Sequence, residues 1–136
     1  GDGGDRRPLL AEIGFWRLAR VQTAADPGPA LLPARGVPAA LSVDDVEGLR
    51  NAVGGFDIEV ALVRADGTSE LLLGQVRGPR IDVATDAVVR PATAKPYTAA
   101  SRMYGLVEGH LLWAWDVAAL GAPMASHASA RLAKVQ

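Results

Sequence analysis

The sequence predicts an all-β, antiparallel fold with one short helix. After Phe56 the chain is a succession of short segments rich in strand-forming residues, with the turn dipeptides Asp66-Gly67 and Glu108-Gly109 between some of them. Helical spacing of apolar residues is confined to one short stretch before Phe56. Several short strands with tight turns and little helix are typical of an antiparallel sandwich or barrel.

Length and composition exclude several classes of protein. A chain of 136 residues suffices for one domain with a core. The 14 Lys and Arg residues are balanced by 15 Asp and Glu residues without a basic block, so nucleic acid is not an expected partner. No apolar run approaches the roughly 20 residues of a membrane span. The chain has no cysteine, which leaves histidine as the borderline-soft metal ligand and fits a reducing cytoplasm.

The first 55 residues predict one strand, an irregular segment and a helix. The chain opens at Gly1 with a charged, turn-like stretch, and the apolar-rich residues 9–20 predict the strand. Four prolines make residues 21–41 neither central strand nor helix interior. Ser42 and Asp45 form a capping-box pattern, which predicts a helix that ends at Gly54 or Gly55.

The remaining residues predict a series of strands. The stretch FDIEVALVRADGTSELLLGQV reads as a hairpin around Asp66-Gly67, and the runs RIDVATDAVV, TAKPYTAASRMYGLV and HLLWAWDVAA read as further strands. In the last run, alternation places Trp113 and Trp115 on one face, which we interpret as core.

The C-terminal stretch GAPMASHASARL carries the most specific motif. Pro123 followed by alanines favours a helix by intrinsic propensity. The spacing, however, resembles the C-terminal signature of nitrobindin-like haem-binding β-barrels, approximately Ala-x-Gly-x-Pro-Leu-x-x-His-x-x-Ala-x-Leu. The residues that match it in register are Ala119, Gly121, Pro123, Met124, His127, Ala130 and Leu132. The segments ATAKPYTAASRMYGLVEGHLLWAWDVAALG and ADGTSELLLGQV are similar to other parts of this family.

The resemblance implies an antiparallel up-and-down β-barrel of the lipocalin or fatty-acid-binding-protein type, with ten strands in the family and about seven in this chain. It makes the C-terminal stretch a strand and residues 1–136 a single barrel domain. The family's N-terminal Gly-x-Trp-x-Gly-x-Gly strand and the two that follow have no match here, so we expect roughly 30 or more preceding residues with three further strands. Seven strands of such a barrel cannot close. Residues 21–55 read as an insertion with a short helix, which is not typical of the family.

The resemblance also implies a cofactor site. His127 corresponds to the proximal ligand of haem b iron, and the small residues around it would leave room for the porphyrin. Lys95 matches the lysine of a Thr-Ala-Lys segment assigned to haem binding, where its ammonium can pair with a propionate. The alternatives remain ordinary strand packing around His127 and an exposed lysine at a strand end, where Pro96 alters the local geometry. His110 follows a turn and is expected to be solvated.

The function that the resemblance implies is haem-dependent isomerisation of peroxynitrite to nitrate, with nitric oxide as a second ligand. The chain would then be a cytoplasmic isomerase whose partners are small molecules, with neither nucleic acid nor membrane involved and with a homodimer left open. Two alternatives stand beside it. One is a carrier of fatty acids or other apolar ligands, since a barrel of this width encloses a cavity. The other is an interaction module built on the Pro-rich segment.

Overall fold

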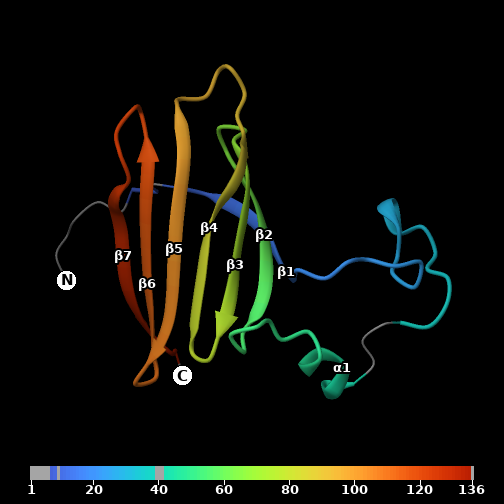
Figure 1. Cartoon of the computed structure of the whole chain (residues 1–136). Coiled ribbons are helices and arrows are strands. Elements are labelled where there is room, and N and C mark those ends of the chain that lie inside the picture. The colour runs from blue at the N-terminus through green and yellow to red at the C-terminus, as the bar shows by residue number, and fades with distance from the viewer. Residues whose placement is uncertain (1–6, 9, 39–41, 136) are drawn as a thin grey trace.

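A computed structural model describes residues 7–8, 10–38 and 42–135, so parts of the predicted opening turn, first strand and Pro-rich segment lie outside the described residues. It forms one antiparallel sheet of seven strands in the order β1-β2-β3-β4-β5-β6-β7 (Figure 1). The strands are β1 (Glu12–Leu18), β2 (Phe56–Arg64), β3 (Ser69–Arg77), β4 (Arg80–Val89), β5 (Tyr97–Val107), β6 (His110–Ala119) and β7 (Ala125–Ala133).

Each strand pairs with its neighbour in sequence, so the predicted all-β, up-and-down topology is confirmed. The backbone angles at the turns explain why consecutive strands lie side by side. Gly67 has φ +89° in the β2–β3 turn, and Glu108 and Gly109 have φ +50° and +75° between β5 and β6. Two consecutive positive φ angles are typical of the tight turn whose twist matches that of the flanking strands. Within the described residues, β1 and β7 are the two edges of the sheet.

The C-terminal segment is a strand, as the resemblance implied and against its helical propensity. β7 pairs with β6 from His110↔Ala133 to Val117↔Ala125. The hydrogen bonds and the packing surface that β6 supplies outweigh the intrinsic preference of an alanine-rich run, since propensities are only tenths of a kcal/mol per residue.

The sheet curls so that its first strand crosses one of its faces. In Figure 1, β1 passes behind the strands that follow it. Two contacts fix this crossing: Glu12 is hydrogen-bonded to Arg102 of β5, and the rings of Trp16 and Tyr104 lie 5.5 Å apart edge to face. The face that β1 crosses is therefore concave, and we call it the inner face.

An apolar core lies on the inner face near the β2–β3–β4 end of the sheet. The buried cluster consists of Ile58, Val60, Leu62, Leu72 and Val83. The alternate residues of β2 supply three of its members, as the two-residue period of a strand requires.

The helix is shorter than the sequence predicts. The capping box at Ser42 is present, with Asp45 N–H donating to the Ser42 hydroxyl, but α1 covers only Val43–Glu47. The prediction of an end at Gly54 or Gly55 is therefore wrong. Gly48 ends the helix, and Asn51 then accepts the backbone N–H of Gly55 in a turn that competes with helical pairing.

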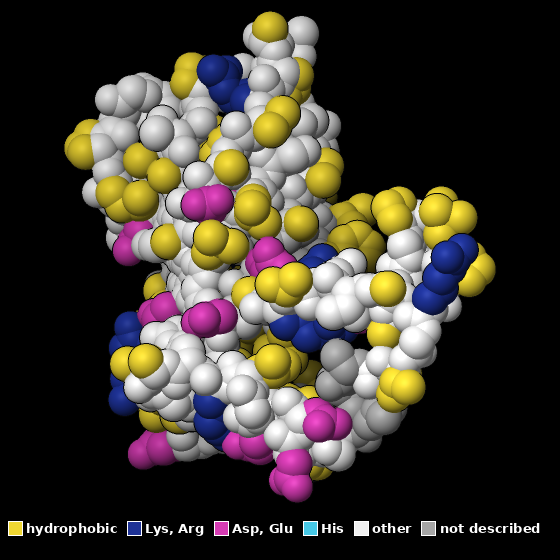
Figure 2. All heavy atoms as spheres, turned by 45° about the vertical axis from the view of Figure 1, so that its right-hand side comes forward, with side chains coloured by type: hydrophobic (Ala, Val, Ile, Leu, Met, Phe, Trp, Pro, Cys, Tyr) yellow, Lys and Arg dark blue, Asp and Glu magenta, His cyan; other side chains and the backbone are white. Residues whose placement is uncertain are grey.

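The segment between β1 and β2 stands away from the sheet. Figure 2 shows apolar side chains on its surface, and Val21, Leu31 and Val37 are 87%, 84% and 74% exposed. Its regular structure in the described residues is a single turn of 3-10 helix, Pro29–Leu31, and the helix α1, neither of which has a buried residue. Among the described residues, no helix has the length and apolar character needed to cross a membrane.

Candidate functional site

The geometry of β7 aims His127 onto the inner face. Trp115 of β6 pairs with Ala128, and Asp116 pairs with Ser126, so His127 is the extra residue of a β-bulge. A bulge re-aims a side chain that strict alternation would place elsewhere. The His127 ring meets Trp115 edge to face, with 4.8 Å between ring centroids and 83° between their planes. His127 itself is exposed.

The imidazole of His127 is chemically available. In the described part of the chain, neither of its ring nitrogens has a hydrogen-bond partner, and Trp115 provides its ring contact. The residues that flank it on β7, including Ala125, Ser126 and Ala128, have small side chains. Among the described residues, the site therefore offers an imidazole nitrogen without a partner on an edge strand, with small side chains around it.

Lys95 lies at the same end of the sheet as His127. It is an exposed residue of the loop that leads into β5, and this loop is joined to the end of β6 by a hydrogen bond of 3.0 Å from the backbone N–H of Leu120 to the carbonyl of Pro96. β7 begins at Ala125, a few residues after that point, and His127 is its third residue. The fold thus brings the two predicted site residues to one end.

The second histidine has the surroundings expected of a surface residue. His110 starts β6 at the opposite end of the sheet, and its Nδ1 lies 3.1 Å from the carbonyl oxygen of Glu108 and 3.2 Å from a guanidinium nitrogen of Arg131. His110 is therefore a control for any role of His127 rather than a candidate ligand.

Sequence reasoning missed a buried polar cluster on the inner face, which we call the ionic cluster: Glu12, Arg64, Glu70, Tyr97 and Arg102. Arg102 binds Glu12 through two hydrogen bonds of 2.5 and 2.9 Å. Arg64 lies 2.7 Å from Glu70 and 3.5 Å from Glu12. The cluster holds two guanidinium and two carboxylate groups, so its formal charges cancel.

Tyr97 and Thr85 complete the hydrogen bonding of Glu70. The phenol of Tyr97 lies 2.9 and 3.0 Å from the two carboxylate oxygens, and the Thr85 hydroxyl also donates to Glu70. Burial, followed by the hydrogen bond to Glu70, raises the pKa of Tyr97 to about 12. At the other end of the cluster, the hydrogen bond from Arg102 lowers the pKa of Glu12.

The Trp115 ring contacts both the ionic cluster and the candidate ligand His127. The Cζ atoms of Arg102 and Arg64 lie 4.6 and 5.8 Å from the Trp115 ring, which in turn contacts His127. Strand parity is the signal that could have located Arg64, because it follows the inward-facing Ile58, Val60 and Leu62 at two-residue spacing.

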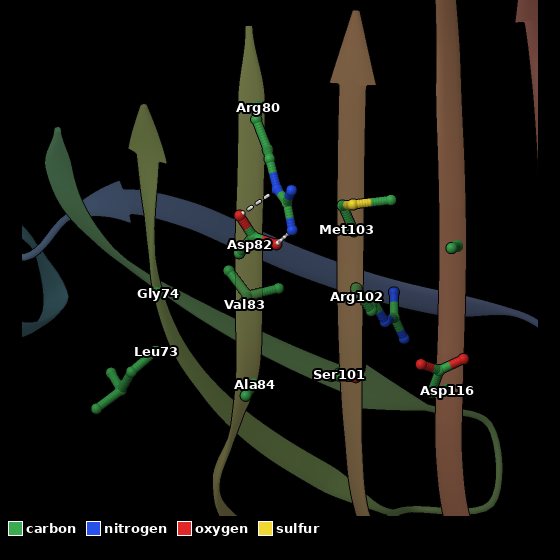
Figure 3. Close-up of a pocket in the computed structure, with 11 residues that line it drawn as sticks. Leu73, Gly74, Arg80, Asp82, Val83, Ala84, Ser101, Arg102, Met103 and Asp116 are labelled. Atoms are coloured by element: carbon green, nitrogen blue, oxygen red, sulfur yellow. Dashed lines mark hydrogen bonds and ion pairs between the residues drawn. The ribbon is translucent and has the colours of Figure 1, made fainter. Parts of the chain in front are cut away.

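A surface pocket of about 460 Å³ spans β3 to β6. Arg102 of the ionic cluster lines it, but neither His127 nor Lys95 does. Figure 3 shows Arg80 bent onto Asp82, with hydrogen bonds of 2.8 and 2.9 Å, at one side of this pocket. An arginine that is paired within its own strand is a surface feature, so we do not place the candidate site there.

The donor atoms at this end of the sheet can be compared with what a haem group needs. Among the described residues, no three His, Cys, Asp or Glu side chains gather in a group that could hold a metal ion. Haem iron needs only one axial protein ligand, and His127 offers a free ring nitrogen among small neighbours. The residues present therefore fit a haem group at this end of the inner face.

Comparisons with known proteins identify the family of this chain. Residues 2–134 match the family model of the THAP4-like, heme-binding beta-barrel domain. Relatives named peroxynitrite isomerase include proteins from Leifsonia xyli subsp. xyli, 59% identical over 97% of this chain and 67% of the relative, and from Clavibacter michiganensis subsp. michiganensis, 59% identical over 94% of this chain and 64% of the relative. A third, from Kocuria rhizophila, is 50% identical over 99% of this chain and 66% of the relative.

The chain thus spans about two thirds of the length of these curated relatives. Among solved structures, a crystal structure of Rv2717c from M. tuberculosis is similar, with a TM-score of 0.51 and 26% identity over 59% of this chain and 54% of that one. The resemblance read from the C-terminal motif is confirmed by the family match. This chain belongs to the family of THAP4-like, heme-binding β-barrel domains.

Proposed function

We propose that this chain binds haem b through His127 and, in that form, isomerises peroxynitrite to nitrate, with nitric oxide as a second ligand. The observation that carries the proposal is the state of His127: an exposed imidazole on the inner face whose ring nitrogens have no hydrogen-bond partner among the described residues, in contrast to the engaged ring of His110. The names of the relatives from Leifsonia xyli and Clavibacter michiganensis support the reaction.

The residues of this chain have separate roles in that proposal. His127 would hold the haem iron through a ring nitrogen, and the small side chains of β7 would leave space for the porphyrin. Lys95 pairs its ammonium with a propionate at the same end of the sheet. When bound, the haem supplies a ferric iron at which the peroxynitrite anion rearranges to nitrate, so the protein needs no general acid or base of its own.

Further features of the whole protein belong to the same proposal. The 136 residues form a single barrel domain in which residues 21–55 are an insertion with a short helix. The protein works in the cytoplasm on small molecules, and a second copy of the chain is its candidate protein partner.

The test is substitution of His127 by alanine in the protein loaded with one equivalent of haem. We expect loss of the histidine-ligated absorption and resonance Raman signatures and a marked fall in the rate of peroxynitrite conversion to nitrate. Some haem will remain bound, because burying a large apolar ring contributes several kcal/mol at about 25 cal/mol per Å². Occupancy is therefore not the readout.

His110→Ala is the matched control and should behave like the parent protein. Retention of both the ligand signature and the rate in His127→Ala would overturn the proposal. A parent protein that binds fatty acids but shows no haem-dependent conversion would instead favour a carrier.

A further inference from the structure

Nothing in the described residues holds the His127 imidazole through a hydrogen bond. Histidines that ligate metals usually donate their second ring N–H to a carboxylate or carbonyl, which fixes the ring plane. His127 has no such partner in the described part of the chain, and its ring contact is the edge-to-face packing with Trp115 at 4.8 Å. The orientation of the ring must then come from packing.

Trp115 is itself held by contacts rather than by a hydrogen bond. The residue is 6% exposed, and its indole Nε1 is buried without a hydrogen-bond partner in the described residues. The Arg102 guanidinium lies 4.6 Å from the ring, a distance at which a cation is attracted to an indole face. The ring of Trp113 lies 6.3 Å away on the same strand.

Arg102 is fixed in turn by Glu12 from the opposite part of the sheet. The Arg102 side chain is 4% exposed, and both of its terminal nitrogens bind the Glu12 carboxylate, at 2.5 and 2.9 Å. Paired, planar hydrogen bonds of this kind define the orientation of a guanidinium more strictly than a single bond. Hydrogen bonds thus join Arg102 to a residue 90 positions away in the chain.

We propose that Trp115 is a positioning residue for His127, and that Arg102 and Glu12 hold Trp115 in place for this purpose. In other metal-binding sites, a hydrogen-bonding partner fixes the ring plane of the ligating histidine. In this protein, packing against the indole does so. The bulge turns His127 inward, and Trp115 then sets the plane of its ring. This inference rests on the proposed role of His127 as the haem ligand.

Trp115→Phe and Trp115→Leu separate a positioning role from simple filling of space. Phenylalanine is smaller than tryptophan but keeps an aromatic ring, and the indole N–H that it lacks has no partner among the described residues, whereas leucine removes the aromatic ring altogether. In the cofactor-free protein, NMR should show nuclear Overhauser contacts between the His127 ring and the ring at position 115 in the parent and in Trp115→Phe. In Trp115→Leu, the His127 side chain should populate more than one rotamer.

The haem-loaded protein gives a second readout. In Trp115→Leu the iron–histidine stretching band should broaden or shift, and haem dissociation should accelerate about tenfold, the lower end of the effect of losing a partner that orients a metal ligand. Trp115→Phe should stay within about twofold of the parent by the same measure. Trp16→Leu is the matched control, because it also removes an aromatic ring and, among the described residues, the ring contact of Trp16 is with Tyr104 and not with Trp115 or His127.

Two results would overturn the inference. One is a Trp115→Leu protein whose His127 rotamer and iron–histidine band equal those of the parent, which would leave the ligand assignment itself intact. The other needs no variant: absence of any contact between the Trp115 and His127 rings in the NMR spectra of the parent. Failure of the proposed function is distinguishable, since His127→Ala would then retain the parent's iron signature whatever residue stands at position 115.

Discussion

Arg64 and Glu70 face each other across the hairpin that joins β2 to β3, with 2.7 Å between Nη2 of Arg64 and Oε2 of Glu70 and with side chains 7% and 0% exposed. A pair so thoroughly removed from water is stabilising only while both charges and the remaining hydrogen bonds are in place. Tyr97 and Thr85 supply those bonds to Glu70. The contribution of each of these four side chains to the stability of the hairpin therefore depends on the other three.

Replacing Glu70 by glutamine should destabilise the protein by about 3 kcal/mol, because it leaves the Arg64 charge buried without its principal partner. Urea unfolding at neutral pH measures the effect. Glu59→Gln is the matched control: it breaks the Arg17–Glu59 pair, whose side chains are 49% and 30% exposed, and should cost less than about 1 kcal/mol. Equal losses in the two variants would contradict this account of the ionic cluster.

Ionisation of Tyr97 should lower the free energy of unfolding in alkaline solution. Burial and the hydrogen bond to Glu70 raise its pKa to about 12, from 10.0 for the free group. The contribution is complete below pH 10 and is lost as the pH rises toward 12, because the unfolded chain ionises first. The parent should lose on the order of 1 kcal/mol more than Tyr97→Phe between pH 9 and pH 11, after allowance for the half-exposed ring. Parallel pH profiles of the two proteins would refute the prediction.

Lys95→Ala should weaken haem binding by roughly three- to tenfold, the loss expected for one partly exposed charge-assisted contact. Haem titration followed by absorption measures the change. The chain has one other lysine, Lys134, which follows the far end of β7 and provides the control. The difference between parent and Lys95→Ala should shrink at high salt, since screening removes the same attraction. A Lys134→Ala variant that weakens binding equally would show that only general charge matters.

Gly74→Ala should be among the most harmful single changes in the sheet. A Cβ atom on Gly74 would overlap the backbone carbonyl of Asp82 on the neighbouring strand, which cannot move without disturbing the β3–β4 pairing. We expect a loss of about 2 kcal/mol or more in the free energy of unfolding. At Gly105 of β5, a Cβ would meet nothing within 4 Å, so Gly105→Ala should be neutral or slightly stabilising. Thermal denaturation of both variants tests the pair.

Replacing residues 21–41 with a short Gly-Ser linker should change the free energy of unfolding by less than about 1 kcal/mol. The described part of this segment is exposed along most of its length, and loop-closure entropy varies slowly with loop length. The ion pair between Asp26 and Arg20, which precedes the segment, involves no strand residue. A large loss of stability, or strong hydrogen-exchange protection within the segment, would argue against this view.

Local signals in the sequence were sufficient for most of the fold. Alternation and the turn dipeptides Asp66-Gly67 and Glu108-Gly109 predicted the all-β class and the hairpins, because both depend on residues close together in the chain. The capping box located the start of α1 but not its end, since the turn built on Asn51 depends on hydrogen bonds that no periodicity reveals. The strand at residues 125–133 came only from the family motif, against local propensity.

The surroundings of His127 were decided by the tertiary structure. The motif identified the residue, but its position against Trp115 depends on a bulge, and therefore on the register between two strands. The sequence also could not identify Glu12 and Arg102 as partners. Their contact spans 90 positions of sequence and forms only when β1 crosses the inner face. Sequence by itself determined which residues alternate and where the chain turns. Which buried charges meet was left to the curvature of the sheet, since an ion pair between distant strands leaves no local pattern in either of them.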